Sequence, residues 1–181
     1  MIGGPWKGTR TIFEFYVLPG CRSRVFDLFD AFLADSQATA INVQSNDAIL
    51  TVMLHAFAKN IASESIVFAD RLTTAHQIDG ATLRQRLEPD SDWAIEMNGE
   101  VAATGGILYH YNRPYGDIYM EVAEAFRRRG LGSYLVQELK RICYEGGSIP
   151  CARCNPQNIA SRKTLQRAGF DPCAHILTGS L

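Results

Sequence analysis

The chain has 181 residues, of which 46% are hydrophobic and 10% aromatic, with 18 basic and 19 acidic side chains. This composition excludes a disordered or fibrous chain, and the near-zero net charge argues against a nucleic-acid-binding protein, which needs a basic surplus. No segment approaches the roughly 18 consecutive apolar residues of a membrane span. The N-terminal sequence lacks the pattern of a secretory signal, so we expect a cytoplasmic protein whose five cysteines are reduced.

The first half of the chain alternates strand and helix patterns and has no glycine between Cys21 and Asp79. β-Branched and aromatic runs predict strands, and apolar residues at helical spacing predict helices. Residues 82–87 are expected to form one or two turns of helix before Pro89. The other expected elements are a strand over residues 11–18, a helix over 22–34, a strand over 40–43, a helix capped by Asn46-Asp47 and a strand over 65–69.

The second half holds 11 of the 15 glycines, and glycine permits tight turns and close backbone approach to a ligand. Asn98-Gly99 predicts a hairpin between two strands, because both central residues of a type I′ turn need positive φ. Gly105-Gly106 indicates a bulge or a close backbone neighbour. The expected elements are strands over residues 93–97, 101–110, 115–123, 148–154 and 173–178, a helix ending near residue 145 and a helix over 158–168. The fold class is therefore α/β or α+β.

The two halves share an outline of strand, arginine-bearing turn, helix, strand, second helix and final strand. The strand before Arg22 parallels the strand before Arg127, and Asn46 parallels Asn155. This order suggests a degenerate internal repeat, although simple alternation of helices and strands can imitate one. We expect residues 1–79 to shape the substrate site without a cofactor motif and residues 80–181 to bind the cofactor.

A basic, glycine-containing turn over residues 127–132 lies between a predicted strand and a predicted helix. Glycines at this point let several backbone N–H groups converge at the helix N-terminus, where the helix dipole favours an anion such as a pyrophosphate. The turn is neither a Rossmann fingerprint, since Leu135 stands where a third glycine is needed, nor a P-loop, since no Gly-Lys-Ser/Thr follows. An ordinary solvated basic turn is the alternative.

Two segments resemble the GNAT superfamily of N-acetyltransferases. Residues 122–133 are similar to its acetyl-CoA motif, Gln/Arg-x-x-Gly-x-Gly/Ala, and residues 155–170 are similar to its last core helix, which ends in Gly-Phe. The resemblance covers roughly residues 92–181. It implies a mixed central sheet flanked by helices, acetyl-CoA as co-substrate and a primary amine as acceptor, with residues 1–79 as a degenerate GNAT-like half.

The resemblance also implies which residues contact acetyl-CoA. The backbone at the end of the central strand would pair with the pantetheine arm and polarise the acetyl carbonyl, the turn amides and a serine would hold the pyrophosphate, and two residues of the next helix would touch the cofactor. These residues are Val122 and Ala123 for the strand, Arg127, Arg128, Arg129, Gly130, Leu131, Gly132 and Ser133 for the turn, and Asn158 and Ser161 for the helix.

Catalysis needs a neutral acceptor amine and therefore benefits from a base. Asp117 and Glu121 alternate onto one face of the predicted strand, so we expect Glu121 to be the base, with Asp117 as second candidate. Both can instead be ordinary solvent-facing residues. The family often places a tyrosine near Leu165 to protonate the departing thiolate, and none is present here. Either the reaction relies on proximity alone, or another acid protonates the thiolate.

A metal site and a nucleic-acid or membrane partner are not expected. Cys151 and Cys154, three residues apart in a strand, point to opposite faces and chelate poorly with Cys173 or His175. His110 is more simply a surface residue than part of an acceptor pocket. The acceptor is a small molecule or a peptide, and a homodimer is possible. The alternatives to an enzyme are a non-catalytic acyl-CoA-binding sensor or a basic turn that docks acidic partners.

Overall fold

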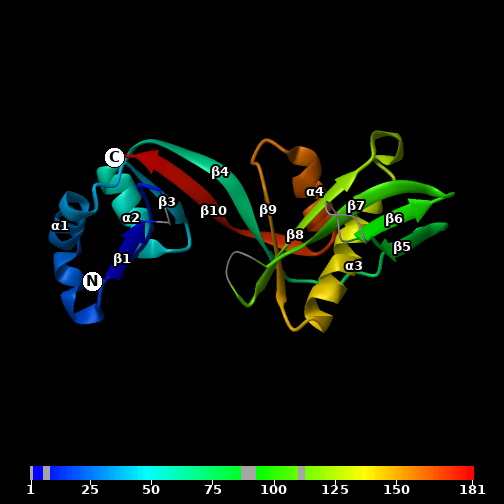
Figure 1. Cartoon of the computed structure of the whole chain (residues 1–181), viewed down its shortest axis with the longest axis horizontal. Helices are drawn as coiled ribbons and strands as arrows, with labels where there is room; N and C mark the ends of the chain where they lie inside the picture. Colours follow the sequence, from blue (N-terminus) through cyan, green and yellow to red (C-terminus); the bar gives the residue numbers. More distant parts are fainter. Residues whose placement is uncertain (1, 6–8, 87–92, 110–112) are drawn as a thin grey trace. The chain divides into compact units, whose positions relative to one another are not determined.

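The structure is a computed structural model that describes residues 2–5, 9–86, 93–109 and 113–181. The chain forms two compact units: unit 1 comprises residues 1–66 and 174–181, and unit 2 comprises residues 67–173. Two strands belong to both units, namely β4 (Lys59–Asp70) and β10 (Phe170–Ser180). Figure 1 labels the elements along the chain.

Unit 1 is a sheet covered by two helices. Its strands are β1 (Ile2–Pro5), β2 (Thr11–Tyr16), β3 (Ala40–Gln44) and parts of β10 and β4, in the order β1-β2-β3-β10-β4. β2 and β3 pair in parallel, whereas β10 pairs with β3 in antiparallel fashion. A 3₁₀ turn, η1 (Pro19–Arg24), leads into α1 (Val25–Ser36), and α2 (Ala48–Phe57) follows β3.

The core of unit 1 consists of aromatic rings and aliphatic side chains between the sheet and its helices. Phe15 on β2 meets Phe29 on α1 edge to face, with 4.7 Å between ring centroids, and Phe57 on α2 lies 5.0 Å from the Phe29 ring. As predicted, α2 begins at a side-chain cap, because Asp47 accepts a hydrogen bond from the Leu50 amide at 3.0 Å. This packing assigns Phe15, Phe29 and Phe57 to the core, whereas Phe13, Tyr16 and Phe26 are exposed.

Unit 2 is a mixed sheet in the order β4-β9-β8-β7-β6-β5. Its further strands are β5 (Ala81–Gln85), β6 (Trp93–Met97), β7 (Glu100–Leu108), β8 (Tyr115–Val122) and β9 (Ile149–Cys154). After β8 come the turn η2 (Glu124–Phe126) and α3 (Leu131–Glu145), which lies against β7 and β8 (Figure 1). α4 (Ile159–Arg167) joins β9 to β10, and Leu131, Leu135 and Leu139 of α3 are buried against the sheet.

The glycine predictions in unit 2 are confirmed. Asn98 and Gly99 have φ values of 52° and 82°, as the hairpin between β6 and β7 requires. At Gly105 a side chain would collide with the carbonyl oxygen of Tyr119, so this glycine permits a close backbone neighbour. The register shift between β6 and β7 does not lie at these glycines but between Ile95 and Glu96, which pair with Ala103 and Val101.

The predicted helical turns at residues 82–87 are wrong. Residues 81–85 form β5, an edge strand antiparallel to β6, in which Leu83 pairs with Ile95. A short segment cannot be assigned to helix or strand by periodicity alone, and pairing with the neighbouring hairpin decides in favour of a strand. Across this pair Arg84 also forms an ion pair with Glu96 at 2.7 Å.

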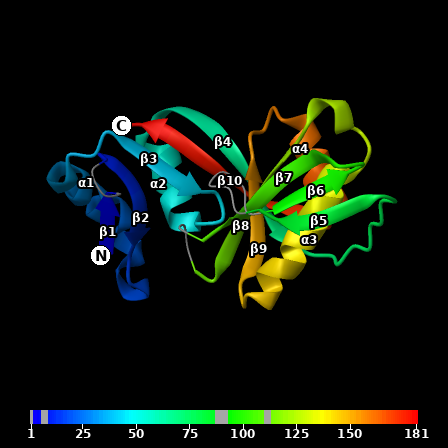
Figure 2. The ribbon, with the colours of Figure 1, turned by 45° about the vertical axis from the view of Figure 1, so that its right-hand side comes forward.

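The two halves repeat one order of elements. In the first half the order is β2, η1, α1, β3, α2 and β4; in the second it is β8, η2, α3, β9, α4 and β10. The leading pair of strands is parallel in both cases. The last strand of each half extends into the other unit, since β10 pairs with β3 while β4 is the neighbour of β9. Figure 2 shows β4 and β10 running side by side.

The compact units therefore divide the chain differently from residues 1–79 and 80–181. The predicted division assigns roles to the two halves, and these roles stay a prediction. No helix in the described part of the chain is long and apolar enough to cross a membrane.

Candidate functional site

The central feature of unit 2 is a gap between two parallel strands. Within the described parts of both strands, the pairing of β8 with β9 ends at Ile118 and Ala152, although β8 continues to Val122 and β9 to Cys154. On its other side β8 stays paired with β7 as far as Val122. The end of β8 therefore presents one backbone edge to the gap.

Strand geometry decides which backbone groups face this gap. The N–H of Ala123 donates to the carbonyl of Ala102 at 3.0 Å, and its own carbonyl accepts from the Phe126 amide at 2.9 Å. Successive residues of a strand direct their backbone N–H and carbonyl groups to opposite edges, so the backbone groups of Val122 face the gap. The structure thus brings Val122 to the predicted position, whereas the backbone groups of Ala123 are used internally.

The turn after β8 contains two residues in the left-handed backbone conformation. Arg128 and Gly130 both have positive φ values, 63° and 82°. Alternation of such left-handed residues with right-handed ones builds an anion-binding nest. Gly130 is also the N-cap of α3 and supplies no side-chain hydrogen bond, so the N–H groups of Leu131, Gly132 and Ser133 in the first helical turn receive no capping side chain.

The three arginines of the turn have different environments. Nε of Arg127 donates to the Val122 carbonyl at 3.1 Å, which fixes the turn to the end of β8. The guanidinium of Arg129 lies 5.4 Å from the centre of the Phe126 ring. All three side chains are exposed. The turn therefore combines positive charge with a backbone nest, as an anion cradle requires.

α3 and α4 meet beside the nest. The hydroxyl of Ser133 donates to the Thr164 carbonyl at 3.1 Å, so its side chain joins the two helices, and the backbone N–H is the group that Ser133 can offer to an anion. A Cβ on Gly132 would stand 3.0 Å from Cγ2 of Thr164. Asn158 caps α4 by accepting from the Ser161 amide at 3.0 Å. The predicted cofactor residues of the two helices thus lie in the first turn of each helix.

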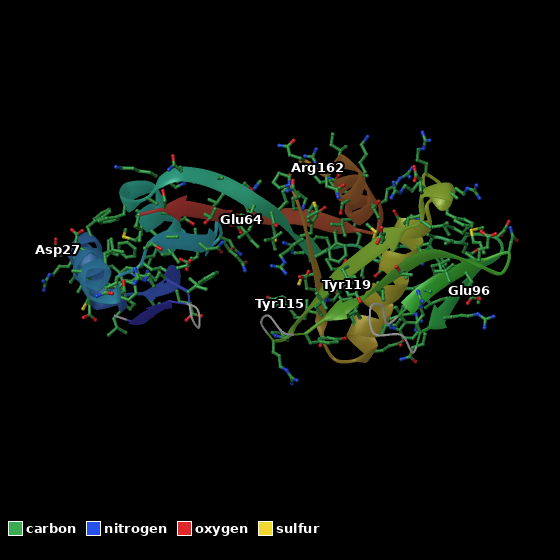
Figure 3. All side chains as sticks on the ribbon, turned by 45° about the horizontal axis from the view of Figure 1, so that its top comes forward. Asp27, Glu64, Glu96, Tyr115, Tyr119 and Arg162 are labelled. Atoms are coloured by element: carbon green, nitrogen blue, oxygen red, sulfur yellow. The ribbon has the colours of Figure 1, made fainter. Side chains whose placement is uncertain are left out.

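The face of the sheet opposite α3 carries the two candidate bases. Glu121 is exposed and pairs through its backbone with Thr104 of β7. Asp117 is buried, and its Oδ2 accepts from Nε and Nη2 of Arg153 on β9 at 2.9 and 2.6 Å. Figure 3 labels Tyr119, which lies between the two acids on β8. A carboxylate held in a buried ion pair is a structural group, so Glu121 is the better placed base.

Two further predictions concern Leu165 and His110. Leu165, at the position where the family often has a tyrosine, is 2% exposed and packs in the core. His110 lies outside the described residues. Among the residues that the structure describes, no group of three His, Cys, Asp or Glu side chains could hold a metal ion.

Burial raises the pKa of several thiols in unit 2. Burial and the nearby Asp117 carboxylate raise the pKa of Cys151 to about 12. Burial likewise raises the pKa of Cys143 and of Cys154, the latter against the opposing effects of the Ser161 hydroxyl and the Arg162 charge. These three thiols therefore stay protonated at neutral pH and are poor nucleophiles.

The difference in exposure between these three thiols and the other two cysteines predicts a labelling pattern. With iodoacetamide at pH 8, Cys21 and Cys173, which are exposed, should be alkylated, whereas Cys143, Cys151 and Cys154 should stay largely unmodified. Peptide mass spectrometry measures the occupancy of each site, and labelling in guanidinium chloride, which should modify all five, is the control. Alkylation of Cys151 as fast as that of Cys21 in the folded protein would contradict the assigned environment.

The sequence reasoning missed three polar residues that organise unit 2. Arg153 pairs with Asp117, Gln137 binds the loop before β5, and Lys140 is 4% exposed inside a polar network. For Lys140 a signal was present: it follows Val136 by four residues on the apolar face of α3. A lysine in such a stripe either extends to the surface or has buried partners.

The comparisons with known proteins agree with this fold. Residues 59–170 match the family model described as the acetyltransferase (GNAT) family. No curated protein matches the chain. Among solved structures, a GNAT-family acetyltransferase from Colwellia psychrerythraea is similar, with 12% identity, 94% of this chain and 77% of that chain covered and a TM-score of 0.76.

Two other solved structures cover nearly the whole chain. A GCN5-related N-acetyltransferase from Kribbella flavida has 15% identity over 99% of this chain and 88% of its own, with a TM-score of 0.63. A tandem GNAT protein from the clavulanic acid biosynthesis pathway has 13% identity over 96% and 76%, with a TM-score of 0.58. Such low identities establish the fold, and the family model establishes more: the chain belongs to the GNAT family of acetyltransferases, enzymes that transfer acyl groups.

Proposed function

We propose that this protein transfers an acetyl group from acetyl-CoA to a primary amine, using the gap beside β8 and the nest at the start of α3. The observation that carries the proposal is the adjacency of these two features. Val122 ends the strand edge that faces the gap, and the nest at Arg128 and Gly130 begins a few residues later. In acetyl-CoA the pantetheine arm leads directly to the pyrophosphate, so a single ligand can occupy the strand edge and the nest together.

The residues present fit such a ligand. The nest offers backbone N–H groups at a helix start, where the dipole favours negative charge, and Arg127, Arg128 and Arg129 add positive charge around it. The corresponding turn of unit 1, η1, runs directly into α1, and the Val25 amide there donates to the Arg22 carbonyl. We therefore expect one acetyl-CoA per chain.

Acetyl-CoA supplies an activated thioester, and the protein supplies orientation, a hydrogen-bond donor and a base. The Val122 N–H, directed toward the gap, would donate to the thioester carbonyl oxygen as negative charge develops there. Glu121 would accept the proton of the attacking amine, directly or through a water molecule. With Leu165 buried, no acid acts from the position of the family's tyrosine.

Replacing Gly130 by glutamate tests the cradle. A side chain at this left-handed position is strained, and a carboxylate there repels the pyrophosphate, so the Kd for acetyl-CoA should rise at least about 30-fold. Isothermal titration calorimetry measures the Kd, and wild-type protein should bind with a stoichiometry of one. No binding of acetyl-CoA by the wild type at high micromolar concentration would overturn the proposed function.

Gly147 provides a matched control at the other end of α3. It has a φ of 73°, so Gly147→Glu introduces similar backbone strain and the same charge, but it lies after the C-terminus of the helix. We expect this variant to lose stability and to keep the wild-type affinity for acetyl-CoA. An equal loss of affinity in both variants would mean that general destabilisation, not the nest, is measured.

A panel of amines distinguishes the enzyme from an acyl-CoA-binding sensor. Release of free CoA thiol in the presence of polyamines, amino acids, aminoglycosides and peptide N-termini would identify the acceptor. A wild-type protein that binds acetyl-CoA yet releases CoA with no amine in such a panel would favour the sensor.

A further inference from the structure

The loop between β4 and β5, residues 71–80, is fixed to α3 at several points; we call it the strap. It contains no helix or strand. It begins where the Arg71 and Leu72 amides both donate to the Gly169 carbonyl at 3.0 Å, just after α4. Gly169 has a φ of 90°, and a side chain there would collide with the Leu72 carbonyl, so this contact requires glycine.

Lys140 of α3 holds the first part of the strap. Its ammonium donates to the carbonyls of Leu72 and Ala168, both at 2.7 Å, and pairs with Asp70 at 2.6 Å. The three donors of the ammonium therefore have three acceptors. The strap thus leaves β4 in a fixed position relative to α3 and α4.

Gln137, one turn earlier on α3, holds the middle of the strap. Its Oε1 accepts from the Thr74 hydroxyl at 2.9 Å and from the His76 amide at 2.6 Å, and its Nε2 donates to the His76 carbonyl at 3.2 Å. The His76 ring donates from Nε2 to the Arg167 carbonyl at 2.8 Å. One side chain therefore satisfies both backbone groups of His76.

The end of the strap reaches the nest. Cδ1 of Ile78 lies 3.6 Å from the point where a Cβ on Gly130 would stand. Gly130, the N-cap of α3, and Gln137 are seven residues apart, which is two helical turns, so they lie on the same side of the helix. The strap therefore runs along α3 from Lys140 past Gln137 to the residue whose left-handed conformation forms the nest.

We propose that the strap pre-organises the nest and that Gln137 is a positioning residue for binding the pyrophosphate of acetyl-CoA, a role that rests on the proposed function. Glycine is the residue with the most backbone freedom, so an unsupported Gly130 would lose entropy on binding. The strap places the Ile78 side chain beside Gly130 and so limits the space into which this backbone can move, and pre-organisation of this kind raises affinity without adding a contact to the ligand.

Gln137→Leu removes the strap's central hydrogen bonds with little change in side-chain volume. We expect the Kd for acetyl-CoA, measured by calorimetry, to rise about tenfold, as the loss of one or two hydrogen bonds implies. S-acetyl-pantetheine, which has the thioester arm without the pyrophosphate, should keep its affinity within about twofold by ligand-observed NMR, because it does not use the nest. A purely structural role would affect both ligands.

Gln166→Leu, the same substitution at an exposed position of α4, is the control and should alter neither affinity. Should Gln137→Leu fail to fold, Ile78→Ala removes the side chain that the strap places beside Gly130, without touching a hydrogen bond, and should raise the acetyl-CoA Kd about threefold. An unchanged acetyl-CoA Kd, or an equal rise for both ligands, would overturn the role of the strap but not the proposed function. Failure of the wild type to bind acetyl-CoA would overturn the proposed function, and this inference with it.

Discussion

Glu121→Gln is expected to lower kcat by about 10²- to 10⁴-fold while leaving the Kd for acetyl-CoA unchanged. An amine attacks a thioester only as the neutral base, and glutamine cannot accept its proton. Glu121 is exposed on the face opposite α3, one residue before Val122, whose backbone faces the gap. Glutamine keeps the size of the side chain, and the backbone pairing with Thr104 does not depend on the carboxylate.

Steady-state kinetics with the acceptor found in the amine panel measure this effect. Glu121→Ala should be rescued in part by millimolar formate, which supplies a small carboxylate in place of the missing one. Glu100→Gln, an exposed acid at the start of β7, is the matched control and should keep kcat. A kcat for Glu121→Gln within about threefold of wild type would show that proximity alone drives transfer.

Asp117 should behave differently from Glu121. Because its carboxylate holds Arg153 through two hydrogen bonds, Asp117→Asn removes half of a largely buried ion pair. The loss should lower the melting temperature as well as activity. Comparing kcat and melting temperature of the two variants therefore distinguishes Glu121 as a base from Asp117 as a residue that fixes the neighbouring strand.

Local signals in the sequence predicted the parts of the fold that depend on few residues. The Asn98-Gly99 hairpin follows from the positive φ that both residues can adopt, and the Asp47 cap follows from one side chain and the start of one helix. The order of strand, glycine turn and helix around Gly130 was also predictable, because the three are consecutive in the chain, and the role of this turn as an anion cradle stays a prediction. Each of these features is complete within a few residues.

Pairings between distant segments could not be predicted in the same way. β5 is a strand because β6 lies beside it, and Asp117 is an ion-pair partner because β9 brings Arg153 to it from 36 residues away. The extension of β4 and β10 each into the other unit depends on strand neighbours that no local pattern specifies. The backbone role of Ala123 failed for a related reason, since its N–H is taken by Ala102 of the neighbouring strand.

Lys140→Met is expected to destabilise the protein by about 3–5 kcal/mol, because it removes one partner of a buried ion pair. The side chains of Lys140 and Asp70 are only 5% and 7% exposed. Without the ammonium, the Asp70 carboxylate keeps its hydrogen bond from the Tyr144 hydroxyl, at 2.9 Å, but loses its ion pair, and the carbonyls of Leu72 and Ala168 lose the donor that Lys140 supplies. Methionine fills most of the volume, so lost polar contacts, not a cavity, account for the effect.

Arg141→Met is the matched control for this substitution. Arg141 is the next residue of α3 and also forms ion pairs, with Glu138 and Glu145, but its side chain is 53% exposed. Exposed pairs contribute at most about 1 kcal/mol, so this variant should unfold close to the wild-type midpoint. Urea denaturation followed by circular dichroism compares the two free energies of unfolding.

A double variant separates the ion pair from the rest of the network. In Lys140→Met/Asp70→Asn the charge left by the first substitution is removed, so the double variant should be more stable than Lys140→Met alone by about 1–2 kcal/mol. The remaining deficit would measure the bonds from the ammonium to the Leu72 and Ala168 carbonyls, which join the strap and α4 to α3, together with the interaction of the ammonium with the Phe170 ring at 5.2 Å. A cost below about 1 kcal/mol for Lys140→Met would mean that this network does not hold unit 2 together.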